Sequence, residues 1–163
     1  FRELERLCAV VSSTGLPPRN LKLEVTESVI AQNPESVKNI LTEIQRFGIQ
    51  LCIDDFGTGY SSFSNLHRFP FDVLKIDRSF IGSIDSNKEA WEISQALVAM
   101  SHKLDLVVVA EGVEKFDQLA RLGEMDCDMA QGYLMAKPLM VEDVEKFMQN
   151  EPEAWTKHAA MVS

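Results

Sequence analysis

Five short, largely apolar segments recur along the chain and alternate with longer stretches of helical periodicity. They span residues 21–25, 49–53, 73–76, 106–110 and 129–135. Apolar strands separated by helices are typical of a parallel sheet covered on its faces, so the sequence predicts an α/β fold. Right-handed crossovers can wind such strands into an open doubly wound sheet or into a closed barrel, and the periodicity favours neither.

Helix signals fill the segments between these strands. Amphipathic periodicity predicts helices that end at Gly15 and Gly48, a long helix that begins after Asn87, and shorter helices over 116–122 and 141–148. Asn33 and Asn87 are well suited to cap the helices that follow them, since an asparagine side chain accepts a hydrogen bond from the first helical turn. The predicted helices next to Gly15, Gly48 and Asn87 thus each have a defined beginning or end.

Length, charge and cysteine content restrict the class of protein. With 163 residues the chain can bury one sizeable core, which predicts a single globular unit. Its net charge of −9 repels a polyphosphate backbone and argues against polymeric nucleic acid as a partner. The longest apolar run, 104–110, is too short for membrane insertion. The three cysteines form no Cys-x-x-Cys pair, which indicates neither disulfides nor a zinc site and favours a reducing cytoplasm.

Polar side chains lie at the ends of all five apolar segments. The first four carry Glu24, Asp54 with Asp55, Lys75, and Glu111, and the fifth carries Gln131. Because the carboxyl ends of parallel strands meet along one rim, these side chains are expected to lie together although they are far apart in the sequence. That rim would hold four carboxylates and one lysine.

Closely packed carboxylates need a compensating charge, because their mutual repulsion raises their pKa values. No histidine or cysteine has metal-ligand spacing, so oxygen-only ligation predicts Mg²⁺, Mn²⁺ or Ca²⁺, and the adjacent Asp54 and Asp55 suit two ions that share ligands. Two such ions fit phosphate-ester hydrolysis. Lys75 could then hold the attacking water or neutralise a phosphate oxygen.

Each of these residues also has a purely structural interpretation. Asp54 and Asp55 could be turn and cap residues, and Glu111 could simply end a strand. Glu24 and Lys75 are harder to explain in this way, since an isolated charge within an apolar strand is costly to bury. The shared placement at strand ends favours the metal hypothesis.

Five sequence segments resemble, in order and spacing, the successive motifs of the EAL-domain cyclic di-GMP phosphodiesterases. They are LKLEVTES, IDDFGTGYSSF, LKIDRSFI, VVAEGVE and QGYLMAKP, within residues 21–138. The resemblance implies a TIM-type β/α barrel of eight strands and hydrolysis of cyclic di-GMP to the linear dinucleotide. It also implies a pair of Mg²⁺ or Mn²⁺ ions at the carboxyl rim.

The resemblance further implies roles for the residues of the rim. Glu24, Asp54, Asp55 and Glu111 match metal ligands of the family, and Asp54 matches the ligand that bridges the two ions. Lys75 matches the lysine near the attacking water. Lys75 and Glu111 are accordingly the expected catalytic residues.

Three further residues match positions around the family's site. Glu27 matches the glutamate that positions the DDFGTGYSS loop, which in the family couples dimerisation to activity. Gln131 and Glu114 match residues of the substrate and metal surroundings. The resemblance therefore implies a homodimer that binds cyclic di-GMP through cations, and this reconciles the negative charge of the chain with a nucleotide ligand.

The match covers about five of the eight barrel strands. The family's Glu-Ala-Leu and N-x-S segments, which carry two further metal ligands, are not found, so residues 1–150 are predicted to be the carboxyl-terminal two-thirds of the domain and residues 151–163 a tail. A sheet that lacks three strands exposes two edges, and self-association is expected. Two hypotheses remain: part of an active phosphodiesterase, or a non-catalytic module that binds cyclic di-GMP or a protein partner.

Overall fold

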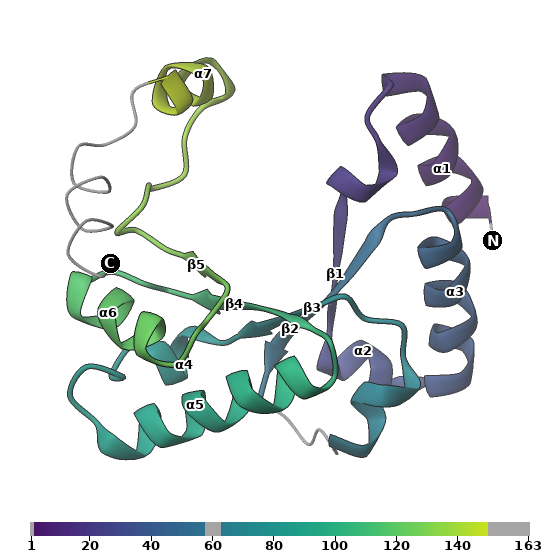
Figure 1. Cartoon of the computed structure of the whole chain (residues 1–163). Helices are drawn as coiled ribbons and strands as arrows, with labels where there is room; N and C mark the ends of the chain where they lie inside the picture. The colour runs from purple at the N-terminus through teal and green to yellow at the C-terminus, as the bar shows by residue number, and fades with distance from the viewer. Residues whose placement is uncertain (1, 58–62, 150–163) are drawn as a thin grey trace.

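The computed structural model describes residues 2–57 and 63–149, in which five parallel strands form one sheet (Figure 1). The strands are β1 (Lys22–Thr26), β2 (Gln50–Phe56), β3 (Val73–Ile76), β4 (Val107–Glu111) and β5 (Met129–Gln131). Their order in the sheet follows their order in the chain, without the reversal that defines a doubly wound sheet. The predicted α/β fold is confirmed, and its winding is that of an incomplete β/α barrel.

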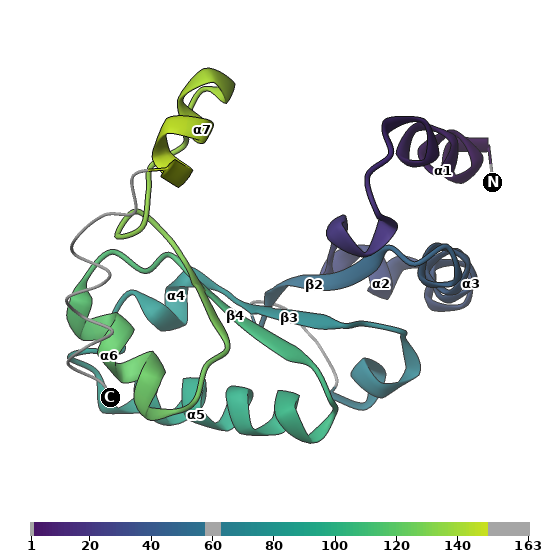
Figure 2. The same ribbon diagram turned by 45° about the horizontal axis from the view of Figure 1, so that its top comes forward.

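The helices alternate with the strands along the chain. They are α1 (Arg2–Thr14), α2 (Glu27–Gln32), α3 (Pro34–Arg46), α4 (Arg78–Ile81), α5 (Lys88–Lys103), α6 (Phe116–Glu124) and α7 (Val141–Gln149), with short 3₁₀ turns at Pro18–Asn20 and Phe63–Arg68. α1 to α3 lie toward one end of the sheet and α4 to α6 toward the other (Figure 2). α7 stands clear of the sheet in both views, and none of its residues is buried.

Two asparagines begin helices as the sequence predicts. The Asn33 side chain accepts a hydrogen bond from the Ser36 N–H at the start of α3. The Asn87 side chain accepts hydrogen bonds from the N–H groups of Glu89 and Ala90 at the start of α5. Both caps satisfy backbone donors that the first turn of a helix leaves without an intrahelical partner.

The helix-covered face of the sheet forms the main core. Leu51, Leu74 and Val108, from three different strands, are completely buried there. They belong to one apolar cluster that also includes residues of the surrounding helices. This face of the sheet is therefore the one that packs against the helices.

The inner face of the sheet has a different chemistry, because successive side chains of a strand point to opposite sides. Cys52, Val73 and Val109 form a small apolar cluster on this face. Two residues farther along β3 and β4, the same face carries Lys75 and Glu111. The inner face is thus apolar at mid-strand and charged at the carboxyl rim.

The final strand is shorter than the predicted segment 129–135, because it ends at Gln131. There the chain leaves the ladder and crosses the segment after β4: Val113 donates a hydrogen bond to the Gln131 carbonyl (3.1 Å), and Leu134 donates one to the Val113 carbonyl (3.0 Å). Gly132 permits this crossing, since a Cβ at that position would lie 2.1 Å from the Val113 oxygen. The expectation of a strand over 132–135 is therefore wrong.

Several other expectations can be compared with the structure. The short helices α2 and α4 are not predicted, because one or two turns show no clear periodicity. All three cysteines are free thiols, as predicted. None of the helices within residues 2–57 and 63–149 combines the length and hydropathy of a membrane span. The predicted DDFGTGYSS loop lies partly, and the predicted tail at 151–163 entirely, outside the described residues.

Candidate metal centre

Lys75 lies at the centre of the charged rim. It comes from β3, where every residue is buried, and only 5% of its own surface is exposed. Its Nζ atom forms ion pairs with three carboxylates from three other strands: Glu24 at 2.8 Å, Asp54 at 3.0 Å and Glu111 at 2.5 Å. The structure thus brings together four of the residues that the sequence places at strand ends.

The three carboxylates determine the charge state of this lysine. Burial alone would lower the pKa of Lys75, but the hydrogen bonds with the carboxylates, that of Glu111 first, outweigh this effect and raise the pKa above its ordinary value of 10.5. The ammonium group is therefore retained at neutral pH. One positive charge faces three carboxylates, so the cluster keeps a net negative charge that can attract cations.

A β-bulge allows two adjacent aspartates to face the same point. β2 has one residue more than β3 between the register pairs Ile53–Leu74 and Phe56–Ile76. Asp55 is in this bulge and has a left-handed φ of 54°. Side chains that follow each other in a regular strand point to opposite faces, so the bulge is what allows the carboxylates of Asp54 and Asp55 to approach each other.

Asp54, Asp55 and Glu111 form a compact group of oxygen donors. Their carboxylate oxygens all lie within 4.8 Å of one another. Oxygen donors without histidine or cysteine suit hard divalent cations such as Mg²⁺ and Mn²⁺. The donor set therefore fits the ions that the sequence predicts, and three of the four predicted ligands are together.

Glu24, the fourth predicted ligand, lies beside this group rather than within it. Its carboxylate pairs with Lys75, and its side chain is 51% exposed, whereas the Asp54 and Glu111 side chains are each 19% exposed. Lys75 therefore connects Glu24 to the two more deeply buried carboxylates. A second cation near Glu24 would have to share its carboxylate with this lysine.

A hollow of about 600 Å³ opens on the inner face next to the rim. Glu24, Lys75 and Gln131 all line it. Gln131 is the register partner of Glu111, so the last residue of β5 lies beside a predicted metal ligand. Glu114 is exposed, beyond the end of β4, and is not among the residues that line the hollow.

Two other residues near the rim are buried. Glu27, which is only 9% exposed, is the first residue of α2 directly after β1. The loop that it is predicted to position contains residues 58–62, which lie outside the described residues. Cys52 lines the hollow, and burial raises the pKa of its thiol to about 12, so it remains a neutral thiol at the floor of the site.

The sequence interpretation did not single out Asp72 and Asp128, which hold the amino ends of the strands that carry Lys75 and Gln131. Each is the residue directly before its strand, and each accepts a hydrogen bond from the backbone of the preceding strand. An aspartate immediately before an apolar run is the signal that could have revealed them. The bulge at Asp55 has no comparable signal, since it depends on the register between two strands.

Comparison with known proteins connects this geometry to a family. The family model of the EAL domain matches residues 3–138. The cyclic di-GMP phosphodiesterase NbdA of Pseudomonas aeruginosa is 46% identical over 139 residues, which make up 85% of this chain and 18% of NbdA. The chain thus spans less than a fifth of the length of that relative.

Solved structures give the same result. The EAL domain of Mycobacterium smegmatis DcpA is 38% identical with a TM-score of 0.85, and the match covers 90% of this chain and 66% of that one. BlrP1 of Klebsiella pneumoniae, in a complex with manganese and cyclic di-GMP, is 31% identical with a TM-score of 0.78. That match covers 83% of this chain and 34% of BlrP1.

Proposed function

Because the chain belongs to the EAL domain family, we propose that it forms the metal-binding portion of a domain that hydrolyses cyclic di-GMP to the linear dinucleotide. The observation that carries the proposal is the group of three carboxylates within 4.8 Å, next to a buried lysine. The phosphodiesterase NbdA and the manganese and cyclic di-GMP complex of BlrP1 support it.

In this proposal Mg²⁺ or Mn²⁺ is held by the oxygen atoms at the rim. Asp54, Asp55 and Glu111 would hold one ion, and Asp54 would share a second ion with Glu24. The chemistry that divalent cations supply when bound is polarisation of the phosphate and an increase in the acidity of water. The carboxylate oxygens of Asp54, Asp55 and Glu111 lie within 4.8 Å of one another, which supports this assignment.

The side chains of this chain would bind and orient the substrate. Lys75 donates hydrogen bonds and is positively charged, so it can hold the attacking water or balance the negative charge that develops on a phosphate oxygen. Gln131, on the edge of the hollow, would contact cyclic di-GMP, and Glu114 would contribute from the turn after β4. Glu27 would position the loop that follows β2.

The negative charge of the protein fits this mode of binding. Cyclic di-GMP carries two phosphates, and a chain with a net charge of −9 would repel them without cations. Bound cations invert the local charge at the rim and attract the phosphates there. Binding of cyclic di-GMP should therefore depend on divalent cation, whereas polymeric nucleic acid should not bind.

The proposal also covers the boundaries and assembly of the chain. Residues 1–150 would be part of the EAL domain and residues 151–163 a tail, located in the cytoplasm. Among the described strands, β1 and β5 each have a partner on one side only. We expect the 163-residue chain to self-associate through these edges, and the complete domain to form a homodimer.

Turnover in a completed domain tests the proposed function. Residues 3–138 would replace the matching segment of the DcpA EAL domain, and the products of cyclic di-GMP would be separated after incubation with Mg²⁺, Mn²⁺ or Ca²⁺. Linear dinucleotide is expected with Mg²⁺ and Mn²⁺. It is not expected with Ca²⁺, which is larger and less exacting in its geometry. The 163-residue chain alone, assayed in parallel, is expected to be inactive.

Two results would contradict the proposal. A folded chimaera that binds Mn²⁺ but yields no linear dinucleotide would exclude hydrolysis, and retention of cyclic di-GMP by that chimaera would instead support the non-catalytic module. A folded chimaera that does not bind Mn²⁺ would exclude the metal centre itself. A thermal melt and a Mn²⁺ titration on the same preparation distinguish these results from misfolding.

A further inference from the structure

Two aspartates make the same contact at the amino ends of two different strands. Asp72 lies directly before β3 and accepts a hydrogen bond from the Leu51 N–H of β2 at 2.8 Å. Asp128 lies directly before β5 and accepts one from the Val108 N–H of β4, also at 2.8 Å. In each case the donor is the second residue of the preceding strand.

The register around the two contacts is identical. The residue after Leu51 pairs with the residue after Asp72, and the residue after Val108 pairs with the residue after Asp128. The carboxylate thus replaces a backbone carbonyl as the acceptor at the first step of the ladder. Because the donors belong to completely buried residues, losing the acceptor would leave an N–H without a partner inside the protein.

Asp72 also connects its strand to a third one. Its own N–H donates to the Leu51 carbonyl at 2.9 Å, and its carbonyl accepts from the Val107 N–H at 3.0 Å. The amino end of β3 is therefore fixed to β2 on one side and to β4 on the other. These are the strands that carry Asp54 and Glu111.

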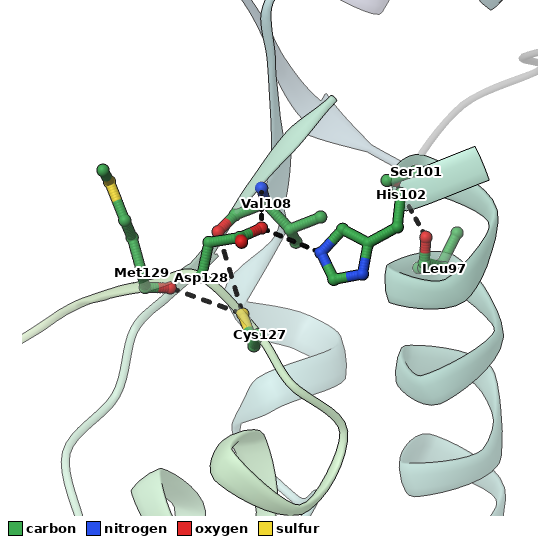
Figure 3. A network of polar contacts seen from close by, with 7 residues as sticks. All are labelled: Leu97, Ser101, His102, Val108, Cys127, Asp128 and Met129. Carbon is green, nitrogen blue, oxygen red and sulfur yellow. Dashed lines mark hydrogen bonds and ion pairs between the residues drawn. The ribbon is translucent and has the colours of Figure 1, made fainter. Parts of the chain in front are cut away.

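Asp128 is held by a polar network around the start of β5 (Figure 3). The same carboxylate oxygen that accepts from Val108 lies 2.9 Å from the His102 ring of α5. Next to it, the Cys127 thiol contacts the carbonyl oxygens of Val108 and Met129. The network connects α5, β4 and the start of an edge strand that has only three residues.

Each aspartate lies three residues before a side chain of the rim. Asp72 precedes Lys75, and Asp128 precedes Gln131. We call each contact between one of these aspartates and the N–H of the preceding strand a clamp. At about 3.3 Å per residue, the clamp aspartate and the rim residue are roughly 10 Å apart, so the aspartate is too far away to contact an ion bound at the rim. A slip of one residue at the clamp would nevertheless move the rim residue to the opposite face of the sheet.

We propose that Asp72 and Asp128 are positioning residues that set the strand register at the amino ends and thereby place Lys75 and Gln131 at the carboxyl rim. This inference rests on the proposed function for the role of the rim residues in binding metal and substrate. The hydrogen bonds of the two clamps do not depend on that function. It assigns these aspartates to the site although neither touches it.

Amide hydrogen exchange on the 163-residue chain tests each clamp separately. Asp72→Ala should speed exchange at Leu51 about tenfold and leave Val108 unchanged. Asp128→Ala should do the reverse, and should also speed exchange at Val113, whose N–H donates to the Gln131 carbonyl. Each variant thus serves as the matched control for the other. Unchanged exchange at the clamped amide of a folded variant would overturn the proposal.

Mn²⁺ affinity, measured by titration, separates positioning from a general loss of stability. As long as the variant stays folded, a lower stability alone does not change its affinity for Mn²⁺. Asp72→Ala should weaken Mn²⁺ binding about tenfold, because β3 lies between the strands of the three carboxylates. Asp128→Ala should leave the affinity within about twofold, since β5 carries none of them. Equal Mn²⁺ affinities of Asp72→Ala and the wild type would overturn the placing of the rim by Asp72.

The Asn variants keep the test decisive if an Ala variant does not fold. Asp72→Asn and Asp128→Asn retain an acceptor oxygen, so both should exchange and bind Mn²⁺ as the wild type does. Asn variants that behave like the Ala variants would show that the charge, and not the acceptor, matters, which would overturn the proposal. A wild-type chain that does not bind Mn²⁺ would contradict the proposed function, while the exchange rates would still decide on the clamps.

Discussion

Replacing Lys75 with methionine removes the cation from the rim and keeps most of its volume. Removing one partner from a buried ion pair typically costs about 3–5 kcal/mol. Water screens part of this cost here, because the Glu24 side chain is 51% exposed and those of Asp54 and Glu111 are 19% exposed. We expect Lys75→Met to lower the free energy of unfolding of the metal-free chain by roughly 2–3 kcal/mol.

Thermal melts with and without Mn²⁺ measure this loss and its origin. At about 2–4 °C per kcal/mol, the metal-free variant should melt roughly 5–10 °C below the wild type. Without the competing ammonium the carboxylates should bind Mn²⁺ more tightly. A ligand at 100 times its Kd stabilises by about 2.7 kcal/mol, so Mn²⁺ should recover most of the loss and raise the melting temperature of the variant more than that of the wild type.

The matched control is Lys88→Met, which removes another lysine that has a carboxylate partner. The Lys88 side chain is 87% exposed and lies 3.4 Å from Glu92, so its loss should change stability by less than about 0.5 kcal/mol. If Lys75→Met melts like this control, Lys75 does not hold the carboxylates together. If Mn²⁺ stabilises Lys75→Met no more than the wild type, the ammonium and the cation do not compete.

Three other predictions concern the rim, the crossing after β5 and the clamp. Asp54→Asn should abolish Mn²⁺-dependent turnover in the completed domain while the metal-free melting temperature holds or rises, since one of three like charges is removed; a marked drop would indicate a structural role. Gly132→Ala should cost roughly 1–3 kcal/mol in melts because its Cβ would meet the Val113 backbone, whereas Gly123→Ala, with open space around it, should not destabilise. Burial would raise the pKa of Asp128, but its hydrogen bonds, that from the Val108 N–H first, lower it below its ordinary value of 3.8. The charge-dependent part of the stability advantage of the wild type over Asp128→Ala should therefore be present above about pH 3.8 and decline as the pH falls further, while the part that comes from the acceptor oxygen remains. An advantage that does not decline at all between about pH 3.8 and pH 2 would contradict this.

The strands and most of the rim are predictable because both depend on local patterns. A run such as 106–110 is too apolar for a loop and too short for a helix, which favours a strand. In a parallel sheet, a charged residue at the end of such a strand lies at the carboxyl rim. The helix starts at Asn33 and Asn87 are predictable for the same reason, since a cap acts within one turn. These features can be predicted because they depend on interactions between residues that are close together in the sequence.

The remaining features depend on residues far apart in the sequence. Asp72 bonds to a backbone group 21 residues earlier, and Asp128 to one 20 residues earlier. β5 ends at Gln131 because the chain crosses over Val113 there. The sequence pattern within 129–135 does not predict this contact. Such contacts exist only once the strands are paired, so propensity and periodicity contain no trace of them.

The last prediction concerns the bulge at Asp55, where the effect of the backbone conformation can be tested separately from the effect of losing the carboxylate. A left-handed φ costs most residues roughly 1–2 kcal/mol but costs glycine almost nothing. Asp55→Gly and Asp55→Ala both lose the carboxylate, yet only the alanine is strained in the bulge. We expect Asp55→Ala to melt below Asp55→Gly and to bind Mn²⁺ several-fold more weakly, because relaxation of the bulge turns Asp54 away from Glu111. Equal melting temperatures and equal Mn²⁺ affinities for the two variants would show that the bulge does not hold the two aspartates together.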